Sequence, residues 1–404
     1  MIKIEEQEKY AKLILERGLA LQPGQSLIIK FEYQQYQFAR LVAKMAYRMG
    51  ARFVEFQMID LELERVKMDN QDINEYQKIP SYYNTIYSDF EKNNWAYLAI
   101  DSTEGGKYLE GSDINKTVAK TKQARKVSKS FHDALNKNKV PWCIVCAPGP
   151  NWAKKVLGED GTEEELWELL KPILKLDKND PSVEWEKETH NFHSRMEYLN
   201  SLKIKSLHYT SNTADLKIGF HKDASWVGGP SELENGTAFY PNLPTYEIFN
   251  APDITQCEGY ITTTKPVKVL GDITEKVRFV FEDGKVKSFT AEKGEDAIQK
   301  LISTDAGSKS LGEVALVDEN SPISQSGKLF SSILFDENAS CHIAIGSCYP
   351  ECFKNIGNDS VSTKNGNISD VHVDFMVGSS SLQIEATTYD GEFVIIMKDG
   401  HYTF

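Results

Sequence analysis

The stretch Ser26-Leu27-Ile28-Ile29-Lys30-Phe31 decides the fold of the first half of the chain. Its apolar run, which follows the Pro23-Gly24 turn, is typical of a buried strand. Apolar residues from Phe38 to Met49 then recur every three or four positions and predict a helix that ends at Gly50. A second strand is predicted over 52–56. Strand, helix and strand with short connections make a βαβ unit, so we expect a parallel sheet with a right-handed crossover.

The same alternation continues on both sides of this unit. Further helices are predicted over 6–17, 118–135 and 163–174, and further strands over 95–100 and 142–146. We therefore expect an α/β N-terminal domain, with a parallel sheet and helices on both faces, over residues 1–179. The polar, proline-terminated segment 176–181 is interpreted as a linker.

The second half of the chain differs in kind. After a predicted helix over 182–202, strand-like segments dominate, and Asp283-Gly284, Asp390-Gly391 and Asp399-Gly400 signal hairpin turns. One helix, over 297–302, interrupts them. We expect a β-rich α+β domain over residues 180–404.

Composition excludes several classes of function. The 404 residues carry a net charge of −13, with 40% hydrophobic and 26% charged residues, and no Lys/Arg cluster stands out. This balance argues against a nucleic-acid partner, because phosphates need a basic surface. No apolar run is long enough to cross a membrane, and the first residues lack the apolar core of a signal peptide, so no membrane partner is expected. Neither a Gly-x-Gly-x-x-Gly motif nor a P-loop occurs, which argues against a nucleotide cofactor.

The cysteines favour a reducing compartment. Six cysteines in a chain of this length do not form a disulfide framework, so a cytoplasmic protein is the simpler interpretation. Cys143 and Cys146 have redox-motif spacing but lie in an apolar strand, where buried thiols act as small hydrophobic groups. The spacing of Cys341, Cys348 and Cys352 matches no paired zinc knuckle.

Two predicted strands near the C-terminus carry candidate metal ligands. In Val371-His372-Val373-Asp374-Phe375 the apolar residues alternate with His372 and Asp374, so these two side chains project from one face. His342 lies near the start of another short apolar strand. One His-x-Asp pair on a strand is more often a polar surface than a metal site.

Two further segments add carboxylates. Glu247 lies between apolar residues just after a turn, and Glu313 lies at the start of the apolar strand 311–318. Each alone is typical of a solvated charge. Together with His342, His372 and Asp374, they supply three carboxylates and two imidazoles, which suits two divalent metals sharing one carboxylate. Oxygen and nitrogen ligation without thiolates favours Zn²⁺, Co²⁺ or Mn²⁺ in a hydrolytic site.

Four ordered segments carry a family resemblance. The segments 244–249, 311–317, 334–342 and 371–378 resemble the motifs of the aminopeptidase T, aminopeptidase S and PepS family of thermophilic-type metallo-aminopeptidases. The resemblance extends to Asp180-Pro181, Trp185, Leu199-Asn200 and Asp215-Leu216, so it covers most of the chain and is densest after Asp180.

The resemblance implies a two-domain, dimeric enzyme whose front domain gates the site and contributes to dimerisation, and whose β-rich domain is catalytic. It places the family's metal ligands on Glu247, Glu313, His342, His372 and Asp374 and its site tyrosine on Tyr349. One departure is visible, because Tyr246-Glu247 stands where relatives usually have two consecutive acids.

The expected activity is removal of N-terminal residues from short peptides by a hydroxide held by two divalent metal ions. Glu313 is the expected ligand that also accepts the proton, and Tyr349 either donates a hydrogen bond to the tetrahedral oxyanion or only packs. Two alternatives stay open: a dinuclear amidase or esterase on non-peptide substrates, and a catalytically idle protein braced by its metals.

Overall fold

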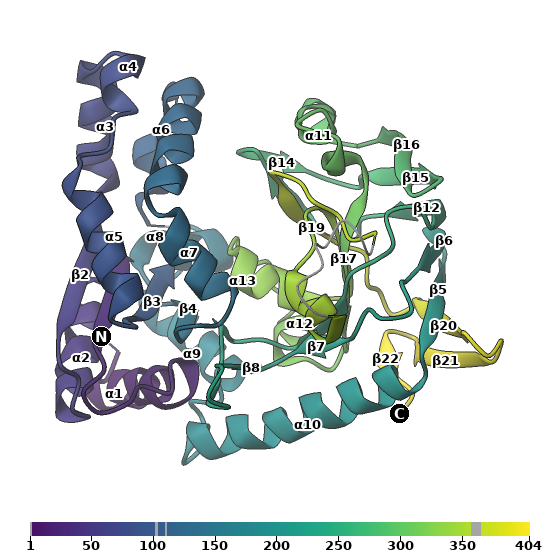
Figure 1. Cartoon of the computed structure of the whole chain (residues 1–404), viewed down its shortest axis with the longest axis horizontal. Coiled ribbons are helices and arrows are strands. Elements are labelled where there is room, and N and C mark those ends of the chain that lie inside the picture. Colours follow the sequence, from purple (N-terminus) through teal and green to yellow (C-terminus); the bar gives the residue numbers. More distant parts are fainter. Residues whose placement is uncertain (1, 102–103, 110, 357–364) are drawn as a thin grey trace. The chain divides into compact units, whose positions relative to one another are not determined.

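The computed structural model describes residues 2–101, 104–109, 111–356 and 365–404, and the chain folds as two compact units (Figure 1). Unit 1 contains Met1–Lys187, Pro230–Pro244 and Leu329–Leu334. Unit 2 contains Glu188–Gly229, Thr245–Lys328 and Phe335–Phe404. In contrast to the continuous segments 1–179 and 180–404 expected from the sequence, unit 1 thus takes in two short later segments.

Unit 1 is built on a parallel five-stranded sheet with the order β10-β4-β3-β1-β2. Its strands are β1 (Leu27–Glu32), β2 (Val54–Ile59), β3 (Ala96–Asp101), β4 (Trp142–Cys146) and β10 (Asn242–Leu243). The first four strands lie where the sequence predicts them, to within three residues at each end. The parallel α/β fold of the front half is confirmed.

Helices cover both faces of this sheet. Ile28 and Tyr97, which are partners in the β1–β3 register, pack with Phe90 of α5 (Tyr82–Lys92) and Phe131 of α7 (Lys129–Asn136) on one face. On the other face the short helix η1 (Ile14–Gly18) lies so close to β4 that a Cβ at residue 18 would be 2.8 Å from the Cys143 sulfur.

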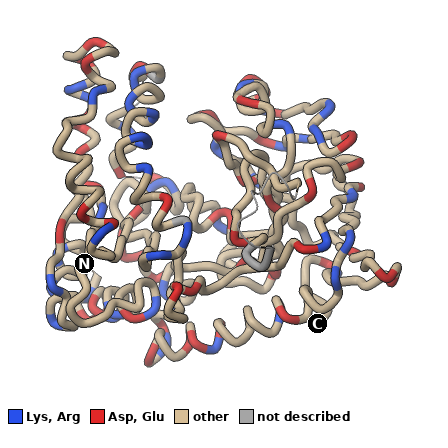
Figure 2. Tube along the Cα trace, in the orientation of Figure 1, with Lys and Arg blue, Asp and Glu red and all other residues tan. Residues whose placement is uncertain are grey.

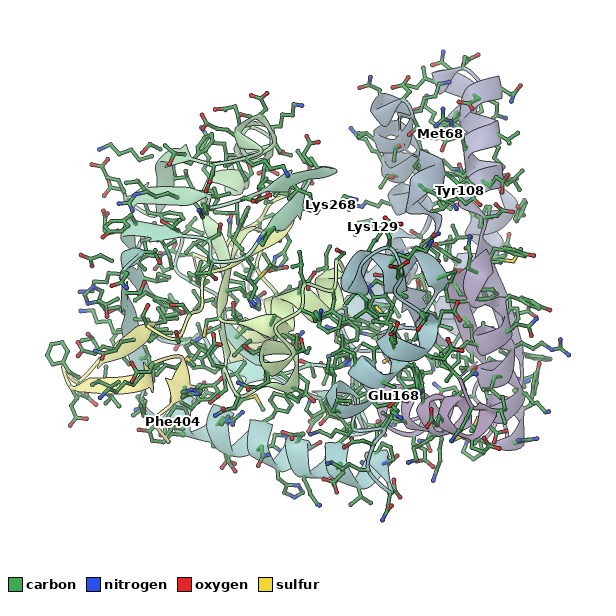
Figure 3. The ribbon with its side chains drawn as sticks, turned by 180° about the vertical axis from the view of Figure 1, so that it is seen from behind. Met68, Tyr108, Lys129, Glu168, Lys268 and Phe404 are labelled. Carbon is green, nitrogen blue, oxygen red and sulfur yellow. The ribbon has the colours of Figure 1, made fainter. Side chains whose placement is uncertain are left out.

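The remaining elements of unit 1 are mostly helical. They are α1 (Ile4–Leu13), η2 (Tyr33–Gln35), α2 (Tyr36–Arg48), α3 (Leu61–Asn70), α4 (Ile73–Tyr76), η3 (Gly105–Leu109), α6 (Ile114–Val127), α8 (Pro150–Leu157), α9 (Glu163–Ile173), α10 (Pro181–Ser201) and the hairpin β8 (Ser231–Glu232) with β9 (Ala238–Phe239). Figure 3 labels Met68 on α3, whose backbone carbonyl accepts a hydrogen bond from Lys116 of α6 at 2.6 Å. α10 continues from unit 1 into unit 2.

Unit 2 contains two antiparallel sheets. One has five strands in the order β19-β18-β17-β11-β7, formed by β7 (Val227–Gly228), β11 (Glu247–Asn250), β17 (Leu311–Val317), β18 (His342–Gly346) and β19 (His372–Met376). The other has eight strands: β5 (Ile204–Ser211), β6 (Ala214–Gly219), β12 (Cys257–Thr262), β15 (Arg278–Glu282), β16 (Lys285–Thr290), β20 (Gln383–Thr388), β21 (Phe393–Lys398) and β22 (His401–Tyr402). The β-rich back half is confirmed.

Short elements complete unit 2. They are the hairpin β13 (Val267–Val269) with β14 (Asp272–Thr274), the helices α11 (Glu295–Ile302), α12 (Pro322–Ser326) and α13 (Ile333–Asp336), and the single turns η4 (Gly307–Lys309), η5 (Glu337–Ala339) and η6 (Pro350–Ile356). α13 begins within unit 1 and ends in unit 2. The predicted Asp-Gly hairpin turns join β15 to β16, β20 to β21 and β21 to β22.

Surface charge and cysteines agree with the composition. Both units carry basic and acidic residues, and α6 carries basic residues without an acidic one (Figure 2). All six cysteines lie in the described ranges, are buried and form no disulfide with one another, as interpreted for Cys143 and Cys146. Within the described ranges, no helix is long and apolar enough to span a membrane.

Candidate metal centre

All five expected ligands lie on one face of the five-stranded sheet of unit 2. Across the sheet, Glu313 of β17 pairs with Ala344 of β18, which pairs with Asp374 of β19. Paired residues share a face, and so do residues two apart on one strand. His342 lies two residues from Ala344, and His372 two residues from Asp374, so both share that face.

β11 places the fifth ligand on the same face. Glu247 pairs with Val317, which lies four residues from Glu313 on β17. Small residues occupy the positions among the ligands, with Ala315 opposite His342 and Ala344 between Glu313 and Asp374. The sheet face therefore leaves room at the centre of the cluster.

A β-bulge lies at the start of β17, between Leu311 and Glu313. The β17–β18 register shifts between Leu311 and Glu313. At the intervening Gly312, a Cβ would lie 2.3 Å from the carbonyl oxygens of Gly346 and Ser347, so the position accepts only glycine without movement of β18. The close backbone approach fixes where Glu313 leaves the strand.

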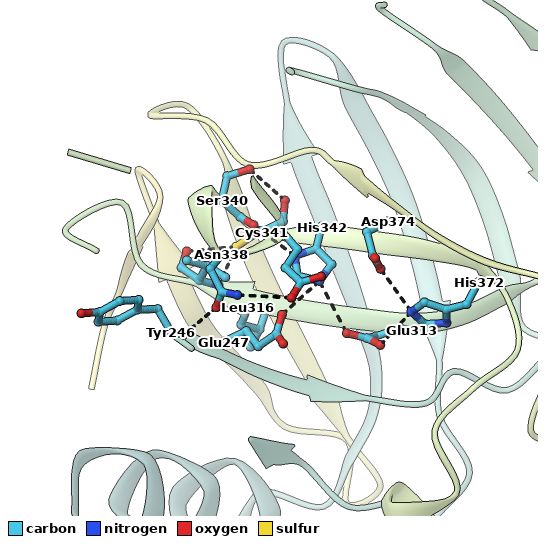
Figure 4. Close-up of polar contacts among 12 residues, drawn as sticks. Tyr246, Glu247, Glu313, Leu316, Asn338, Ser340, Cys341, His342, His372 and Asp374 are labelled. Carbon is cyan, nitrogen blue, oxygen red and sulfur yellow. Dashed lines mark hydrogen bonds and ion pairs between the residues drawn. The ribbon is translucent and has the colours of Figure 1, made fainter. Parts of the chain in front are cut away.

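The ligand atoms form two groups that share Glu313 (Figure 4). The first contains Glu247, Glu313 and His342, with His342 Nε2 3.2 Å from Glu247 Oε2 and 3.5 Å from Glu313 Oε1. The second contains Glu313, His372 and Asp374, with His372 Nε2 3.5 Å from Glu313 Oε2 and 3.2 Å from Asp374 Oδ1. The two oxygens of Glu313 thus face different groups.

Backbone carbonyls orient both imidazoles. His342 Nδ1 lies 3.3 Å from the Ser340 carbonyl oxygen, and His372 Nδ1 lies 2.7 Å from the Ser347 carbonyl oxygen. A proton on Nδ1 donates to the carbonyl, so Nε2 is the ring atom that faces the carboxylates. This is the arrangement typical of histidine ligands to metals.

Burial and charge strongly perturb the site groups. Burial, together with the charges of Glu247 and Asp374, raises the pKa of Glu313 although both imidazoles oppose the shift. Burial disfavours the charged form of Asp374, but His372 outweighs it and the pKa of Asp374 is lowered. Burial opposes charge on His372 as well, yet Asp374 and Glu313 raise the pKa of His372 to about 10. Such mutual dependence is typical of functional sites.

The donor set fits divalent metal ions. Glu247 Oε2, Glu313 Oε2 and Asp374 Oδ1 are buried and accept no hydrogen bond from the described part of the chain. Buried carboxylate oxygens without donors are costly unless a cation is bound, so these atoms have the chemistry of ligands. The His and carboxylate mixture suits borderline divalent ions.

Tyr349 lies at the edge of the cluster. Its ring packs edge-on against His372 with 4.9 Å between ring centroids and lies 5.5 Å from the Phe249 ring. The side chain is 47% exposed, so a substrate can reach it. Partial burial and the nearby Glu313 and Asp374 raise the pKa of Tyr349, which keeps the phenol a hydrogen-bond donor at neutral pH.

Sequence reasoning overlooks two residues that border the site. Burial and the charges of Glu247 and Asp374 raise the pKa of Glu337 well above its usual value, so this carboxyl feels the charge of the cluster. Beside it, Asn338 is fully buried and accepts a hydrogen bond from the backbone of Tyr246. Both lie in the motif 334–342, but an acid next to another acid in a polar segment reads as a solvated charge.

The Tyr246-Glu247 pair explains the visible departure from the family pattern. The Tyr246 ring is directed away from the cluster, whereas Glu247 is directed into it (Figure 4). Because neighbouring residues on a strand face opposite sides, the first position of this pair is not where the sheet places a ligand. The change to tyrosine therefore leaves the ligand set intact.

The α/β unit, the β-rich unit and the shared carboxylate between two His-containing groups define a metal-dependent hydrolase. More specifically, the chain belongs to the thermophilic metalloprotease (M29) family, whose model matches residues 4–402.

Relatives match over nearly their whole length. Aminopeptidase PepS of Streptococcus thermophilus is 33% identical over 402 residues, which cover 98% of this chain and 97% of the relative. Aminopeptidase AmpS of Bacillus subtilis (strain 168) is 34% identical, with 98% of each chain covered. The solved structure of wild-type AmpT from Thermus thermophilus superposes with a TM-score of 0.92 at 32% identity and covers 99% of both chains. The family resemblance and the fold expected from it are confirmed.

Proposed function

We infer that this protein is a metal-dependent aminopeptidase that removes N-terminal residues from short peptides. Its family and the aminopeptidase relatives support the activity. The finer proposal is that two divalent ions share the site, one in the Glu247–Glu313–His342 group and one in the Glu313–His372–Asp374 group.

One observation carries the two-ion proposal: each oxygen of Glu313 faces a different imidazole. A carboxylate in this position can bridge two ions. Charge supports bound cations, because Glu247, Glu313 and Asp374 are three carboxylates with buried oxygens gathered in the two groups. Zn²⁺, Co²⁺ and Mn²⁺ all suit these donors.

When bound, the ions would supply an activated water and Lewis-acid polarisation of the scissile carbonyl. The chain's own contribution begins with Glu313, whose carboxylate holds the centre of the site. Glu313 is the proposed acceptor of the water's proton, which it would return to the leaving amine. Tyr349 is the proposed donor to the oxygen that gains negative charge, because its phenol is neutral and accessible. Selection for a free amino terminus would come from coordination of the neutral amine to an ion or from a carboxylate that pairs with the ammonium.

Hydrolysis of a free leucyl peptide and its N-acetylated twin tests this function. The protein is first chelated, and Co²⁺, Zn²⁺ or Mn²⁺ is then added back while bound metal is counted. Cleavage of the free peptide alone, restored at two ions per chain, is expected. Equal cleavage of both peptides would instead indicate a general amidase. Bound metal without turnover of either peptide would indicate an idle protein.

Assembly and compartment belong to the proposal as well. We propose a homodimer to which unit 1 contributes the contact, and a gating role for unit 1; a fully active monomer in gel filtration would overturn the dimer. A cytoplasmic location is supported by the six buried cysteines, which form no disulfide with one another in the described ranges.

A further inference from the structure

We propose that Asn338 is a positioning residue that holds Glu247 and Glu337 in place and so sets the affinity of the first metal group, Glu247–Glu313–His342. The inference rests on the proposed two-ion function. It adds a residue that touches neither ion and acts through the ligands.

The first contact of Asn338 fixes the strand that carries Glu247. Asn338 Oδ1 accepts a hydrogen bond from the backbone N–H of Tyr246 at 2.5 Å, and both groups are buried. Tyr246 directly precedes Glu247, the first residue of β11. The strand therefore begins at a point set by a side chain from a segment about 90 residues further along the chain.

The second contact reaches the carboxylate of Glu337. Asn338 Nδ2 lies 3.5 Å from Glu337 Oε1, at the long end of hydrogen-bond distance. The Asn338 side chain thus makes two contacts. Its oxygen accepts from the backbone N–H that precedes Glu247, and its NH₂ group faces the carboxylate of Glu337. An aspartate cannot do both, because it lacks the donor.

Asn338 itself is buried, and its backbone is hydrogen-bonded. The residue is 0% exposed and lies in the turn η5, just before β18. Its carbonyl oxygen accepts from Ser321 Oγ at 3.4 Å. Two residues on, the Ser340 carbonyl faces His342 Nδ1. The same turn therefore supports Glu247 and His342 of the first metal group as well as Glu337.

The second metal group has a separate support. The carbonyl of Ser347, in the loop after β18, orients His372 through a 2.7 Å contact with Nδ1. Because the two groups are braced by different segments, loss of Asn338 should affect one ion more than the other.

Stepwise Co²⁺ titration of the chelated protein, followed by calorimetry and visible absorption, tests the proposal. Asn338→Leu keeps the branched shape of the side chain and removes its hydrogen-bonding atoms. We expect one of the two binding steps to weaken about 10- to 100-fold, as for other groups that orient metal ligands, and the other to change less than about twofold. Glu247→Gln and His372→Ala identify which step belongs to which group.

Asn338→Asp and Asn250→Ala complete the design. Asn338→Asp keeps the acceptor for the Tyr246 amide but lacks the donor to Glu337, so a smaller loss in the same step is expected. This variant tests the proposal if Asn338→Leu does not fold. Asn250 is a matched control, since it is a buried amide on β11 that faces the opposite side and accepts from the backbone N–H of Ala251. Asn250→Ala should leave both steps unchanged.

Thermal unfolding separates positioning from mere packing. A positioning role lowers the increase in Tm that Co²⁺ produces, whereas a packing role lowers the Tm of the chelated protein and leaves that increase unchanged. Equal weakening of both steps, or no weakening in either Asn338 variant, would overturn the proposal. Wild-type protein that binds fewer than two ions would overturn the two-ion function itself, and the inference with it.

Discussion

Two buried glutamates, Glu104 in unit 1 and Glu313 in unit 2, differ in the hydrogen bonds that their carboxylates accept. They are 1% and 3% exposed. The Glu104 oxygens accept backbone N–H groups of Asn151 and Trp152, at 2.9 and 2.7 Å, in the first turn of α8. Glu313 Oε2 accepts no hydrogen bond from the described residues.

The difference follows from the two sheets. The parallel sheet of unit 1 alternates with helices, whose first N–H groups lack partners within the helix and are available to a carboxylate. The antiparallel sheet of unit 2 has its backbone groups paired strand to strand, so a carboxylate on its face finds no backbone donor. Glu104 therefore serves the fold, whereas Glu313 calls for a cation.

Glu313→Gln gives the largest expected effect on this comparison. The substitution keeps the shape but removes the charge that both metal groups share, so kcat/KM should fall about 10³-fold or more. The chelated variant should be at least as stable as the wild type, because an uncompensated buried charge is lost. Steady-state kinetics measures the fall in kcat/KM, and denaturant unfolding of the chelated variant measures its stability.

A retained kcat in Glu313→Gln would remove the role assigned to Glu313. A large loss of stability in the chelated variant would show that its charge serves the fold, as that of Glu104 does.

Glu104→Gln should show the opposite pattern. One of its two acceptor oxygens becomes an NH₂ group facing a helix N–H, which should cost about 1–3 kcal/mol of unfolding free energy. Metal affinity should stay within about twofold of the wild type, well inside the 10- to 100-fold loss typical of residues that orient ligands. Chemical unfolding and metal titration measure both, and Glu159→Gln, an exposed acid of the same unit, is the matched control.

An unchanged unfolding free energy in Glu104→Gln would show that Glu104 does not stabilise the fold. A loss of metal binding in this variant would show that Glu104 also affects the metal site.

Local sequence patterns predicted much of both sheets. The strand over 142–146 lies at its predicted bounds, since a short apolar run flanked by turn residues specifies itself locally. The helices α3 and α4 were not predicted, because their polar sequences show little apolar periodicity. α5 was missed although Tyr83, Ile86 and Phe90 recur at helical spacing. Asp60 and Asp72, whose side chains accept the first N–H groups of α3 and α4, were the available signals.

The five ligand residues could be predicted from the sequence, but the strand order that brings them together could not. Period-two alternation placed His372 and Asp374 on one face. The order β19-β18-β17-β11 is set by pairings between distant segments, which no local pattern encodes. The register shift at Gly312 and the contact from Asn338 to Tyr246 depend on the same pairings, so the shared position of Glu313 emerges only in three dimensions.

Ala344→Val tests whether the metal site needs the open space on the sheet of unit 2. Ala344 lies between Glu313 and Asp374, where two added methyl groups would fill space needed for an ion. We expect metal affinity to fall about 10-fold or more, with about 1–3 kcal/mol lost by overpacking. Isothermal titration and unfolding curves measure these effects.

Ile343→Val is the matched control on the opposite face of β18. It should cost about 0.5–1.5 kcal/mol of stability and leave metal binding unchanged. Equal metal affinities in the two variants would contradict the assigned faces.

Asp318→Asn gives the smallest expected effect and extends the comparison to pH. Although burial disfavours its charge, Asp318 is paired with His401 Nδ1 at 2.9 Å and accepts the Tyr402 N–H at 3.1 Å, so the pKa of Asp318 is lowered. A carboxyl whose folded pKa is depressed stabilises the fold above its unfolded pKa, about 4, and the contribution disappears as pH falls through the folded pKa. The Tm difference between wild type and Asp318→Asn should therefore be present at pH 6 to 7 and shrink steadily below about pH 4. A difference that stays constant with pH would show that shape rather than charge matters at this position, and that Asp318 does not belong with Glu104 among the acids that serve the fold.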